Sequence, residues 1–365
     1  MIKLDGNYGE GGGQIVRTAL ALSTITQKPF EVDNIRKGRC NAGLKAQHLN
    51  CIKALEKLCN AKAEGAKLAS EYLKYYPRKI KGQTLEVDIG TAGSISLLLQ
   101  SLLIPCFFAD KNVRLRIIGG TEGKWAMPYD YLKEILVPQL KRFCDKIDVK
   151  LVKRGYYPKG GGIVDIKIIP KYKLADFSNF DEFYKKVKEE NKIELIEQGN
   201  LMQIKGVSHA SLGLQNAKVA ERQANSAKNI LNKYKCPIDI RAEYADTLSP
   251  GTGVTLWAIF SKDKDDINEK NPIRLGADAL GERGKPAEKV GKEAASNLIK
   301  EIESKASVDS HLADQILPFL ALTKDSRIKV SEITNHCRTN IYVIEQFLGK
   351  LFEIDEKEKI ISIKQ

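Results

Sequence analysis

The feature that most constrains the fold is a pattern that occurs three times along the 365-residue chain. Each copy has a polar or glycine-rich opening, an apolar helix, a strand-like stretch, then a polar loop and a second amphipathic helix. The copies begin with EGGGQIVRTALALSTIT, GTAGSISLLLQSLLIPC and VDSHLADQILPFLALT. We interpret them as three degenerate β-α-β-α repeats, which predict an α/β (α+β) fold.

The uneven spacing of the copies indicates an insertion. The first two copies start 80 residues apart, counted from Gln14 to Ser94, and the third starts more than 200 residues later. The chain between them opens with the charged run DEFYKKVKEENKIE (181–194) and carries two helical patterns around the strand-like GVTLWAIFS. We therefore predict a large domain from residues 1–184 and 301–365, with a smaller α/β domain inserted over 185–300 before the third repeat.

Composition limits the partners and the compartment. The formal net charge of +13 favours acidic partners such as nucleic acid, nucleotides or an anionic membrane surface, although a lysine-rich solvated surface explains it equally well. No apolar run of about 18 residues indicates a membrane span, and the N-terminus does not resemble a secretory signal. Seven scattered cysteines without CxxC spacing indicate no zinc ribbon or redox pair and fit a reducing cytoplasm.

Glycine-rich loops are the first candidates for binding chemistry. They are GNYGEGGGQ, GGTEG, YYPKGGG and SPGTG, and each also reads as a tight turn. None matches GxxxxGK[ST] or a clean GxGxxG after a strand, which excludes a P-loop and a Rossmann enzyme. EGGGQIVR differs, because Gln14 and Arg17 follow its three glycines one helical turn apart on one face. This combination suits a helix start that binds phosphate.

A basic loop, IRKGRCNAGLKAQH, places Arg36, Lys37 and Arg39 before another helix. Arginine forks bind phosphate in a bidentate way, and a helix N-terminus adds amide donors. A charged surface turn is the alternative reading.

His336 stands apart from the other histidines because of its position. It opens the second helix of the third copy, where the first copy has Arg36–Arg39 and the second has Lys124–Pro128. If the repeats pack around a common centre, the three loops meet at one pocket. The positive end of the helix disfavours imidazolium and so favours the neutral, nucleophilic ring, and the same helix end can hold a phosphate.

The remaining histidines and other catalytic patterns give weaker signals. His48 and His209 read as structural, and His311 with Asp314 three residues on is only a weak HxxD metal pattern. The chain contains no GxSxG elbow, no HExxH and no isolated carboxylate pair.

Taken in order, these motifs resemble the signatures of the RNA 3′-terminal phosphate cyclase family. The motifs are EGGGQIVRTALALS, IRKGRCNAGLKAQH, GTAGSISLLLQ, RGYYPKGGG, HLADQILPFLAL and NHCRTNIYVIEQF, and they span about residues 5 to 350. The resemblance implies three repeats, each of two helices on a four-stranded sheet, with a smaller α/β domain inserted before the third.

The resemblance also implies a three-step reaction. A histidine attacks the α-phosphate of ATP to form a covalent histidine–AMP and release pyrophosphate. AMP then moves to the 3′-phosphate of RNA, giving an RNA-(3′)pp(5′)A end, and the adjacent 2′-OH attacks to form a 2′,3′-cyclic phosphate. Mg²⁺ or Mn²⁺ is the implied metal, and an RNA with a 3′-phosphate end is the implied partner. Recognition is expected at the RNA end rather than of sequence, since no RNP-type aromatic signature is present.

Residue by residue, the resemblance assigns the nucleophile to His336 and the placing of metal and nucleotide to Glu10. The polar residues required for activity, expected at the RNA end or the ATP phosphates, are Arg17, Arg36, Arg39 and Gln47; Gln14 joins this phosphate-binding group through its place beside the triglycine turn. Positions lining the adenosine pocket are Gln100, Pro128, Asp314 and Gln315. His311 departs from the family pattern, because many relatives have a tyrosine there that stacks on adenine; imidazole is also flat, so His311 stays in the expected set.

Two rival functions remain open at this point. Cyclase-like proteins that bind RNA in ribosome assembly keep the fold without the nucleophile, and His336 argues against that reading. Enolpyruvyl transferases are built from similar repeats and need no covalent nucleotide. The sequence leaves open a homodimer and says nothing about which RNAs are processed.

Overall fold

The computed structural model describes residues 1–262 and 270–364. It contains four four-stranded sheets of mixed strand direction with helices packed on them, which confirms the α/β class. Three sheets share one strand order, in which the strands that come first, second, fourth and third in the sequence lie side by side. The first two of these strands are parallel, and the other neighbours are antiparallel.

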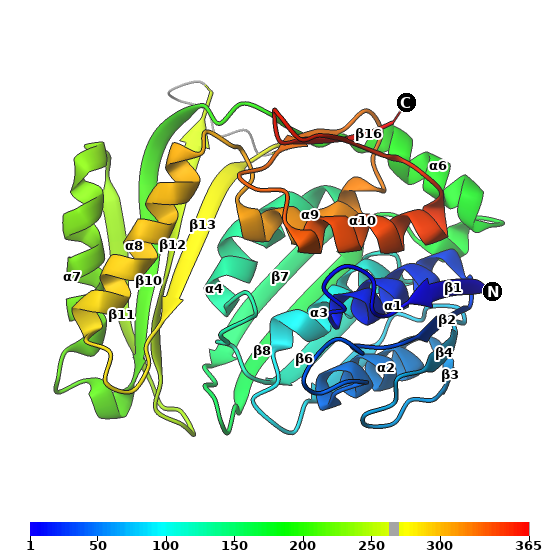
Figure 1. Cartoon of the computed structure of the whole chain (residues 1–365), viewed down its shortest axis with the longest axis horizontal. Coiled ribbons are helices and arrows are strands. Elements are labelled where there is room, and N and C mark those ends of the chain that lie inside the picture. Colours follow the sequence, from blue (N-terminus) through cyan, green and yellow to red (C-terminus); the bar gives the residue numbers. More distant parts are fainter. Residues whose placement is uncertain (263–269, 365) are drawn as a thin grey trace.

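The first unit comprises residues 2–76. Its elements are β1 (Ile2–Asp5), α1 (Gln14–Thr26), β2 (Phe30–Asp33), α2 (Ala46–Cys59), β3 (Lys62–Glu64) and β4 (Leu73–Tyr76), with sheet order β1-β2-β4-β3. Every residue of α1 is buried. A helix that is apolar on nearly all sides belongs in a core, and α1 packs between α3 and α10 (Figure 1).

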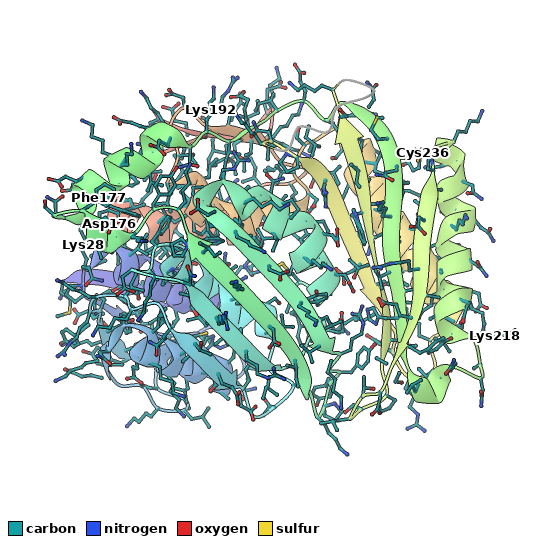
Figure 2. The ribbon with its side chains drawn as sticks, turned by 180° about the vertical axis from the view of Figure 1, so that it is seen from behind. Lys28, Asp176, Phe177, Lys192, Lys218 and Cys236 are labelled. Carbon is teal, nitrogen blue, oxygen red and sulfur yellow. The ribbon has the colours of Figure 1, made fainter. Side chains whose placement is uncertain are left out.

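The second unit follows directly. Its elements are β5 (Thr84–Asp88), α3 (Ile95–Phe107), β6 (Val113–Gly119), α4 (Tyr129–Tyr131), a π-helical turn (Leu132–Leu136), α5 (Val137–Leu140), a 3₁₀ turn (Lys141–Phe143), β7 (Cys144–Lys153) and β8 (Gly162–Pro170), with sheet order β5-β6-β8-β7. Figure 2, which shows the molecule from behind, has this sheet in front of the helices. The helices therefore pack on one face of the sheet, and the opposite face is turned outward.

The third unit is divided in the sequence. A 3₁₀ turn (Leu174–Asp176), α6 (Phe180–Glu190) and β9 (Glu194–Leu195) precede the strands of the fourth sheet in the sequence, and α9 (Ser310–Leu320), β14 (Arg327–Lys329), α10 (Asn335–Leu348), β15 (Phe352–Asp355) and β16 (Ile360–Ile363) follow them. Strand β9 pairs in parallel with β14. The charged run 181–194, expected to open the insert, therefore forms α6 and reaches the sheet of the third unit.

The fourth sheet lies within the span predicted for the inserted domain. Its elements are β10 (Asn200–Ser211), a 3₁₀ turn (Leu212–Leu214), α7 (Val219–Leu231), a second 3₁₀ turn (Asn232–Tyr234), β11 (Ile238–Ala245), β12 (Thr252–Ser261), β13 (Ile273–Leu280) and α8 (Ala287–Glu303), with order β11-β10-β12-β13. Helices α7 and α8 cover one face, on the left of Figure 1, and α4 and α9 reach the sheet at β13 from the other side. The division at 185–300 stays a prediction.

Among the described residues, no helix is long and apolar enough to cross a membrane.

Candidate functional site

A cavity of about 480 Å³ lies where the starts of three helices meet the edge of the fourth sheet. Gln14 and Arg17 enter it from α1, His311, Asp314 and Gln315 from α9, and His336 from α10. Helix α3 adds Leu97 and Gln100, and the segment that leads into α4 and the end of β13 with its following loop supply further walls. These walls include Gly123, Lys124, Trp125, Ala126, Met127, Asp278, Ala279, Leu280, Glu282 and Lys285.

The imidazole of His336 is held in one orientation by Gln14. The Gln14 amide nitrogen donates to the backbone carbonyl of His336 at 3.2 Å, which turns the amide oxygen toward the ring; that oxygen lies 2.7 Å from Nδ1. An amide oxygen can only accept, so Nδ1 must carry the proton, and Nε2 then presents a lone pair. The side chain is 48% exposed and lines the cavity, so the ring is accessible from it.

Glu10 connects this ring to the basic loop. Its Oε2 lies 3.6 Å from His336 Nε2 and 3.3 Å from Arg39 Nη2. Arg39 Nε also donates to the backbone carbonyl of Glu10 at 3.0 Å. The start of α10, the residue before the triglycine turn and the basic loop therefore meet around one carboxylate.

The triglycine turn is shaped by the residues behind it. A Cβ on Gly13 would lie 2.1 Å from His48 Nε2 and 2.9 Å from Arg17 Nη1, so only glycine allows the start of α1 to approach this closely. His48 is buried in α2, and its Nδ1 accepts from the Lys45 backbone at 2.9 Å. Burial lowers the pKa of His48 to about 3, and Arg17 and Arg36 add to the shift. His48 is therefore a neutral packing group at neutral pH.

Arg17 and Arg36 are close to one another without a carboxylate partner among residues 1–262 and 270–364. Arg17 is 9% exposed, and its Nε donates to the amide oxygen of Gln100 at 2.6 Å. Burial lowers the pKa of Arg17 to about 10; Cys51 opposes the shift and Arg36 adds to it. Burial followed by repulsion from Arg39 lowers the pKa of Arg36, whose Nε has no hydrogen-bond partner in the described part of the chain. A buried and a half-buried cation without acidic partners favour an anion.

The expected adenosine residues form a connected polar wall. Gln100 Nε2 donates to Gln315 Oε1 at 2.8 Å, which extends the contact made by Arg17. Asp314 Oδ1 accepts from the hydroxyl of Thr334, the N-cap of α10, at 2.8 Å and from the Cys337 thiol at 3.2 Å. Burial raises the pKa of Asp314, and these two donors oppose the shift. Asp314 thus fixes the start of the helix that carries His336.

Three expected residues have different surroundings. His311 is exposed on the cavity wall with its ring edge-on to Tyr131, 6.3 Å between centroids. Pro128 is buried as the N-cap of α4 and does not line the cavity, although Met127 beside it does. Gln47 also lies outside the lining, because its amide pairs in both directions with the backbone of Ser94, at 2.8 and 2.9 Å.

Sequence reasoning missed the contribution of the fourth sheet to this cavity. Asp278, Ala279, Leu280, Glu282, Lys285 and Glu293 all line it. Burial raises the pKa of Asp278 to about 6, with His311 opposing the shift. The segment GADALGERGKP gave no local signal of this role, because strand ends and charged loops look alike wherever they are placed.

Chemically, the site joins an exposed imidazole, whose Nε2 is not used by Gln14, to a group of arginines suited to phosphate, beside a cavity large enough for a nucleoside. A carboxylate, that of Glu10, stands next to this nitrogen. Such a set can carry nucleophilic attack on a phosphoryl group while stabilising the negative charge.

Comparisons with known proteins show the family of the chain. The family model for RNA 3′-terminal phosphate cyclase matches residues 8–354. The chain is 45% identical over 356 residues to the RNA 3′-terminal phosphate cyclase of Pyrococcus furiosus, which covers 97% of this chain and 95% of that protein. It is 40% identical to the protein of the same name from Archaeoglobus fulgidus over 99% of this chain and 100% of that protein. The chain therefore belongs to the RNA 3′-terminal phosphate cyclase family and is an enzyme of that family.

Proposed function

We propose that the chain uses ATP to convert an RNA 3′-terminal phosphate into a 2′,3′-cyclic phosphodiester, through a covalent adenylate on His336. The orientation of the His336 ring is the observation that carries this proposal. Gln14 occupies Nδ1 and leaves Nε2 for attack, in a cavity that Arg17 lines without an acidic partner among residues 1–262 and 270–364. The names and the 40–45% identity of the archaeal relatives support the overall reaction.

In the first step, Nε2 attacks the α-phosphorus of ATP. The N–P bond forms as the bond between the α-phosphorus and the bridging oxygen breaks, and pyrophosphate leaves with that electron pair. The proton on Nδ1 stays hydrogen-bonded to the Gln14 amide oxygen, which stabilises the positive charge that develops on the ring. Arg39, Arg36 and Arg17 are the residues proposed to bind the phosphates that gain charge.

In the second step, an oxygen of the RNA 3′-phosphate attacks the adenylate phosphorus. The N–P bond breaks and the Nε2 lone pair is restored. In the third step, the neighbouring 2′-OH loses its proton and attacks the 3′-phosphorus, and AMP departs. Activation by AMP turns a poor leaving group into a good one, which is why ATP is consumed.

Glu10 is the residue proposed to hold Mg²⁺ or Mn²⁺. Its side chain is 35% exposed and faces Nε2, and one carboxylate together with phosphate oxygens and water is a set that Mg²⁺ commonly accepts. A bound divalent cation supplies positive charge to the phosphates. Arg39, which pairs with Glu10, must then share the Glu10 carboxylate with the cation or turn its guanidinium to the phosphates.

The adenosine is assigned to the wall formed by Gln100, Asp314 and Gln315, with His311 stacking on the base. Pro128 follows the cavity-lining Met127 in the sequence and is proposed to act indirectly, as the N-cap of α4. Gln47 is proposed to act indirectly, by fixing Ser94 at the start of α3.

The test is labelling with [α-³²P]ATP in the presence of Mg²⁺ or Mn²⁺. We expect the wild type to acquire an acid-labile, base-stable label and His336→Asn to acquire none. His311→Asn is the matched control: it also loses an imidazole from the cavity, and it should still form the adduct, at higher ATP concentration. Label in His336→Asn at the wild-type level, or none in the wild type, would refute the proposal. Turnover of 3′-phosphorylated RNA without phosphoenolpyruvate excludes the transferase reading, and any turnover excludes a purely structural role in ribosome assembly.

A further inference from the structure

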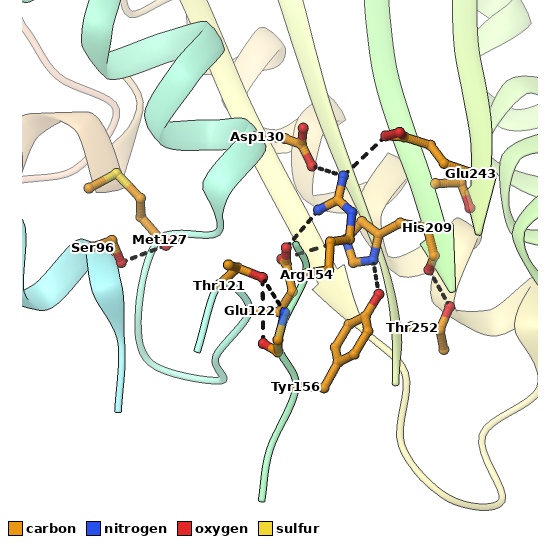
Figure 3. Close-up of polar contacts among 12 residues, drawn as sticks. Ser96, Thr121, Glu122, Met127, Asp130, Arg154, Tyr156, His209, Glu243 and Thr252 are labelled. Atoms are coloured by element: carbon orange, nitrogen blue, oxygen red, sulfur yellow. Dashed lines mark hydrogen bonds and ion pairs between the residues drawn. The ribbon is translucent and has the colours of Figure 1, made fainter. Parts of the chain in front are cut away.

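Arg154 lies at the centre of a buried group of charges that the proposed reaction does not use. It is the arginine of the RGYYPKGGG motif, directly after β7, and it is 3% exposed. Its guanidinium binds Glu122 at 2.7 Å, Asp130 at 2.8 Å and Glu243 at 3.1 Å (Figure 3).

Two of these carboxylates stand at the two ends of one wall of the cavity. Glu122 precedes the segment 123–129, Asp130 follows it, and residues 123–127 of that segment line the cavity. The backbone closes the same loop, because the Tyr129 amide donates to the Thr121 carbonyl at 3.0 Å. The guanidinium therefore joins the ends of segment 123–129 through side chains as well.

The same group of charges reaches the opposite wall through the fourth sheet. Glu243 is on β11, and His209 on β10 directs Nε2 to Glu122 Oε2 at 3.5 Å and Nδ1 to the Tyr156 hydroxyl at 2.7 Å. The sheet register aligns His209 with Gly253 on β12, and Gly253 with the cavity-lining Leu280 on β13.

Gly253 makes this cross-strand connection tight. A Cβ there would lie 3.0 Å from the His209 ring and 3.1 Å from the Leu280 side chain. The side chains of His209 and Leu280 thus both border the space over this glycine, which brings the buried group of charges and the cavity-lining end of β13 to the same place on the sheet.

The electrostatics agree with a tightly coupled group. Burial lowers the pKa of Arg154, but Glu122 and Asp130 outweigh it and hold that pKa above its ordinary value. Burial raises the pKa of Asp130, with Arg154 opposing, whereas His209 and Arg154 together overcome burial and lower the pKa of Glu122. An ion pair at this depth is strongly sensitive to loss of one partner.

A metal ion is the competing reading of the group. Glu122, Asp130 and His209 offer ligand atoms within 4.8 Å of one another, and Glu122 Oε2 is buried without a hydrogen-bond partner in the described chain. Arg154 already supplies the cation to both carboxylates, and a divalent ion would repel it at this distance. The contacts therefore favour a role in positioning.

We propose that Arg154 is a positioning residue that fixes two walls of the nucleotide cavity, segment 123–129 and the end of β13, relative to each other. The inference rests on the proposed function, since it assigns ATP to this cavity. Arg154 itself does not line the cavity, so its effect is expected on ATP binding more than on the chemical step.

The test compares ATP-dependent labelling kinetics in Arg154→Met, Arg154→Lys and the triple variant Arg154→Met/Glu122→Gln/Asp130→Asn, in which the two carboxylates are neutralised together with the cation. For Arg154→Met we expect KM for ATP to rise about tenfold or more, with kcat for adenylylation changed by about threefold or less. Arg154→Lys keeps the positive charge but loses the forked guanidinium that binds several carboxylates at once. Its KM for ATP should therefore lie between those of the wild type and Arg154→Met.

The triple variant separates positioning from stability. Arg154→Met leaves the buried carboxylates of Glu122 and Asp130 without their arginine and should lower Tm. In the triple variant both carboxylates become neutral amides, so Tm should recover while KM for ATP stays high. Restoration of both Tm and KM would show a role in stability alone. Arg116→Met is the matched control: Arg116 pairs with Asp165 at 3.3 Å across β6 and β8 and touches neither wall, so KM should not change.

A fluorescence measurement gives a readout that does not depend on turnover. The chain has two tryptophans, Trp125 in segment 123–129, 87% exposed, and Trp257, buried on β12. In a Trp257→Phe background, Arg154→Met should lower the anisotropy of Trp125 as the segment loosens. If the wild type labels normally and Arg154→Met changes neither the anisotropy of Trp125 nor KM for ATP, the inference is overturned. Absence of label in the wild type would instead count against the proposed function. Stoichiometric Mn²⁺ binding that is lost in Glu122→Gln would favour the metal reading.

Discussion

Gln14 offers a sharp test of how the nucleophile is prepared. Replacing it with alanine removes the acceptor 2.7 Å from His336 Nδ1 and the donor to the His336 carbonyl, while His336 itself remains. One hydrogen bond contributes about 0.5–1.5 kcal/mol, and the ring also becomes free to rotate or to carry its proton on Nε2, where it could not attack. Loss of a group that orients an imidazole in this way commonly costs about 10–100-fold, or about 1.4–2.8 kcal/mol in the barrier.

The assay is single-turnover formation of the labelled adduct at saturating ATP. We expect the rate constant of Gln14→Ala to fall by about 10–100-fold, with a smaller change in ATP affinity. Gln83→Ala is a suitable control, because Gln83 also donates to a backbone carbonyl, that of Lys57, but lies outside the cavity. Adduct formation by Gln14→Ala within about twofold of the wild type would show that Gln14 does not prepare the ring.

Three further predictions concern the basic loop and two perturbed groups. Arg39→Ala should reduce cyclisation of a 3′-phosphorylated RNA by more than about tenfold, at least about 1.4 kcal/mol, with an unchanged circular dichroism spectrum; wild-type turnover would remove this loop from the site. His48 should weaken the fold in acid, because its folded pKa of about 3 lies below the ordinary value and the unfolded chain therefore binds the proton first. The free energy of unfolding should fall by about 1.4 kcal/mol per pH unit between about pH 6.5 and pH 3. Urea titrations should show a smaller slope for His48→Gln. Asp278 should act in the opposite direction, because its folded pKa of about 6 lies above the ordinary value. Its contribution to the free energy of unfolding is therefore present below the unfolded pKa and is lost as the pH rises through about 6. Urea titrations of Asp278→Asn should lack about 1–3 kcal/mol of this pH dependence.

Much of the fold follows from local pattern. The strand-like stretches at 29–35, 113–119 and 327–333 form β2, β6 and β14, and the two helical patterns between 216 and 304 form α7 and α8. Alternation and helical periodicity express burial on one face, which is a local property. Strand β9 escaped prediction because it has two residues and pairs with β14, more than 130 residues away.

The site shows the same division between local and distant information. Helix starts and glycine turns can be read from the sequence, and the structure brings Glu10, Gln14, Arg39 and His336 together. Arg154 could not be placed in this way. Its partners Glu122, Asp130 and Glu243 are 24 to 89 residues distant, and in the sequence each resembles a surface charge.

The most direct measurement locates the adenylate atom by atom. With ¹⁵N-labelled histidine and unlabelled ATP, the adduct should show a one-bond ³¹P–¹⁵N coupling to Nε2 of His336, while Nδ1 keeps its proton. Coupling to Nδ1, or to a different histidine, would contradict the account, because Gln14 holds Nδ1 in the structure described here.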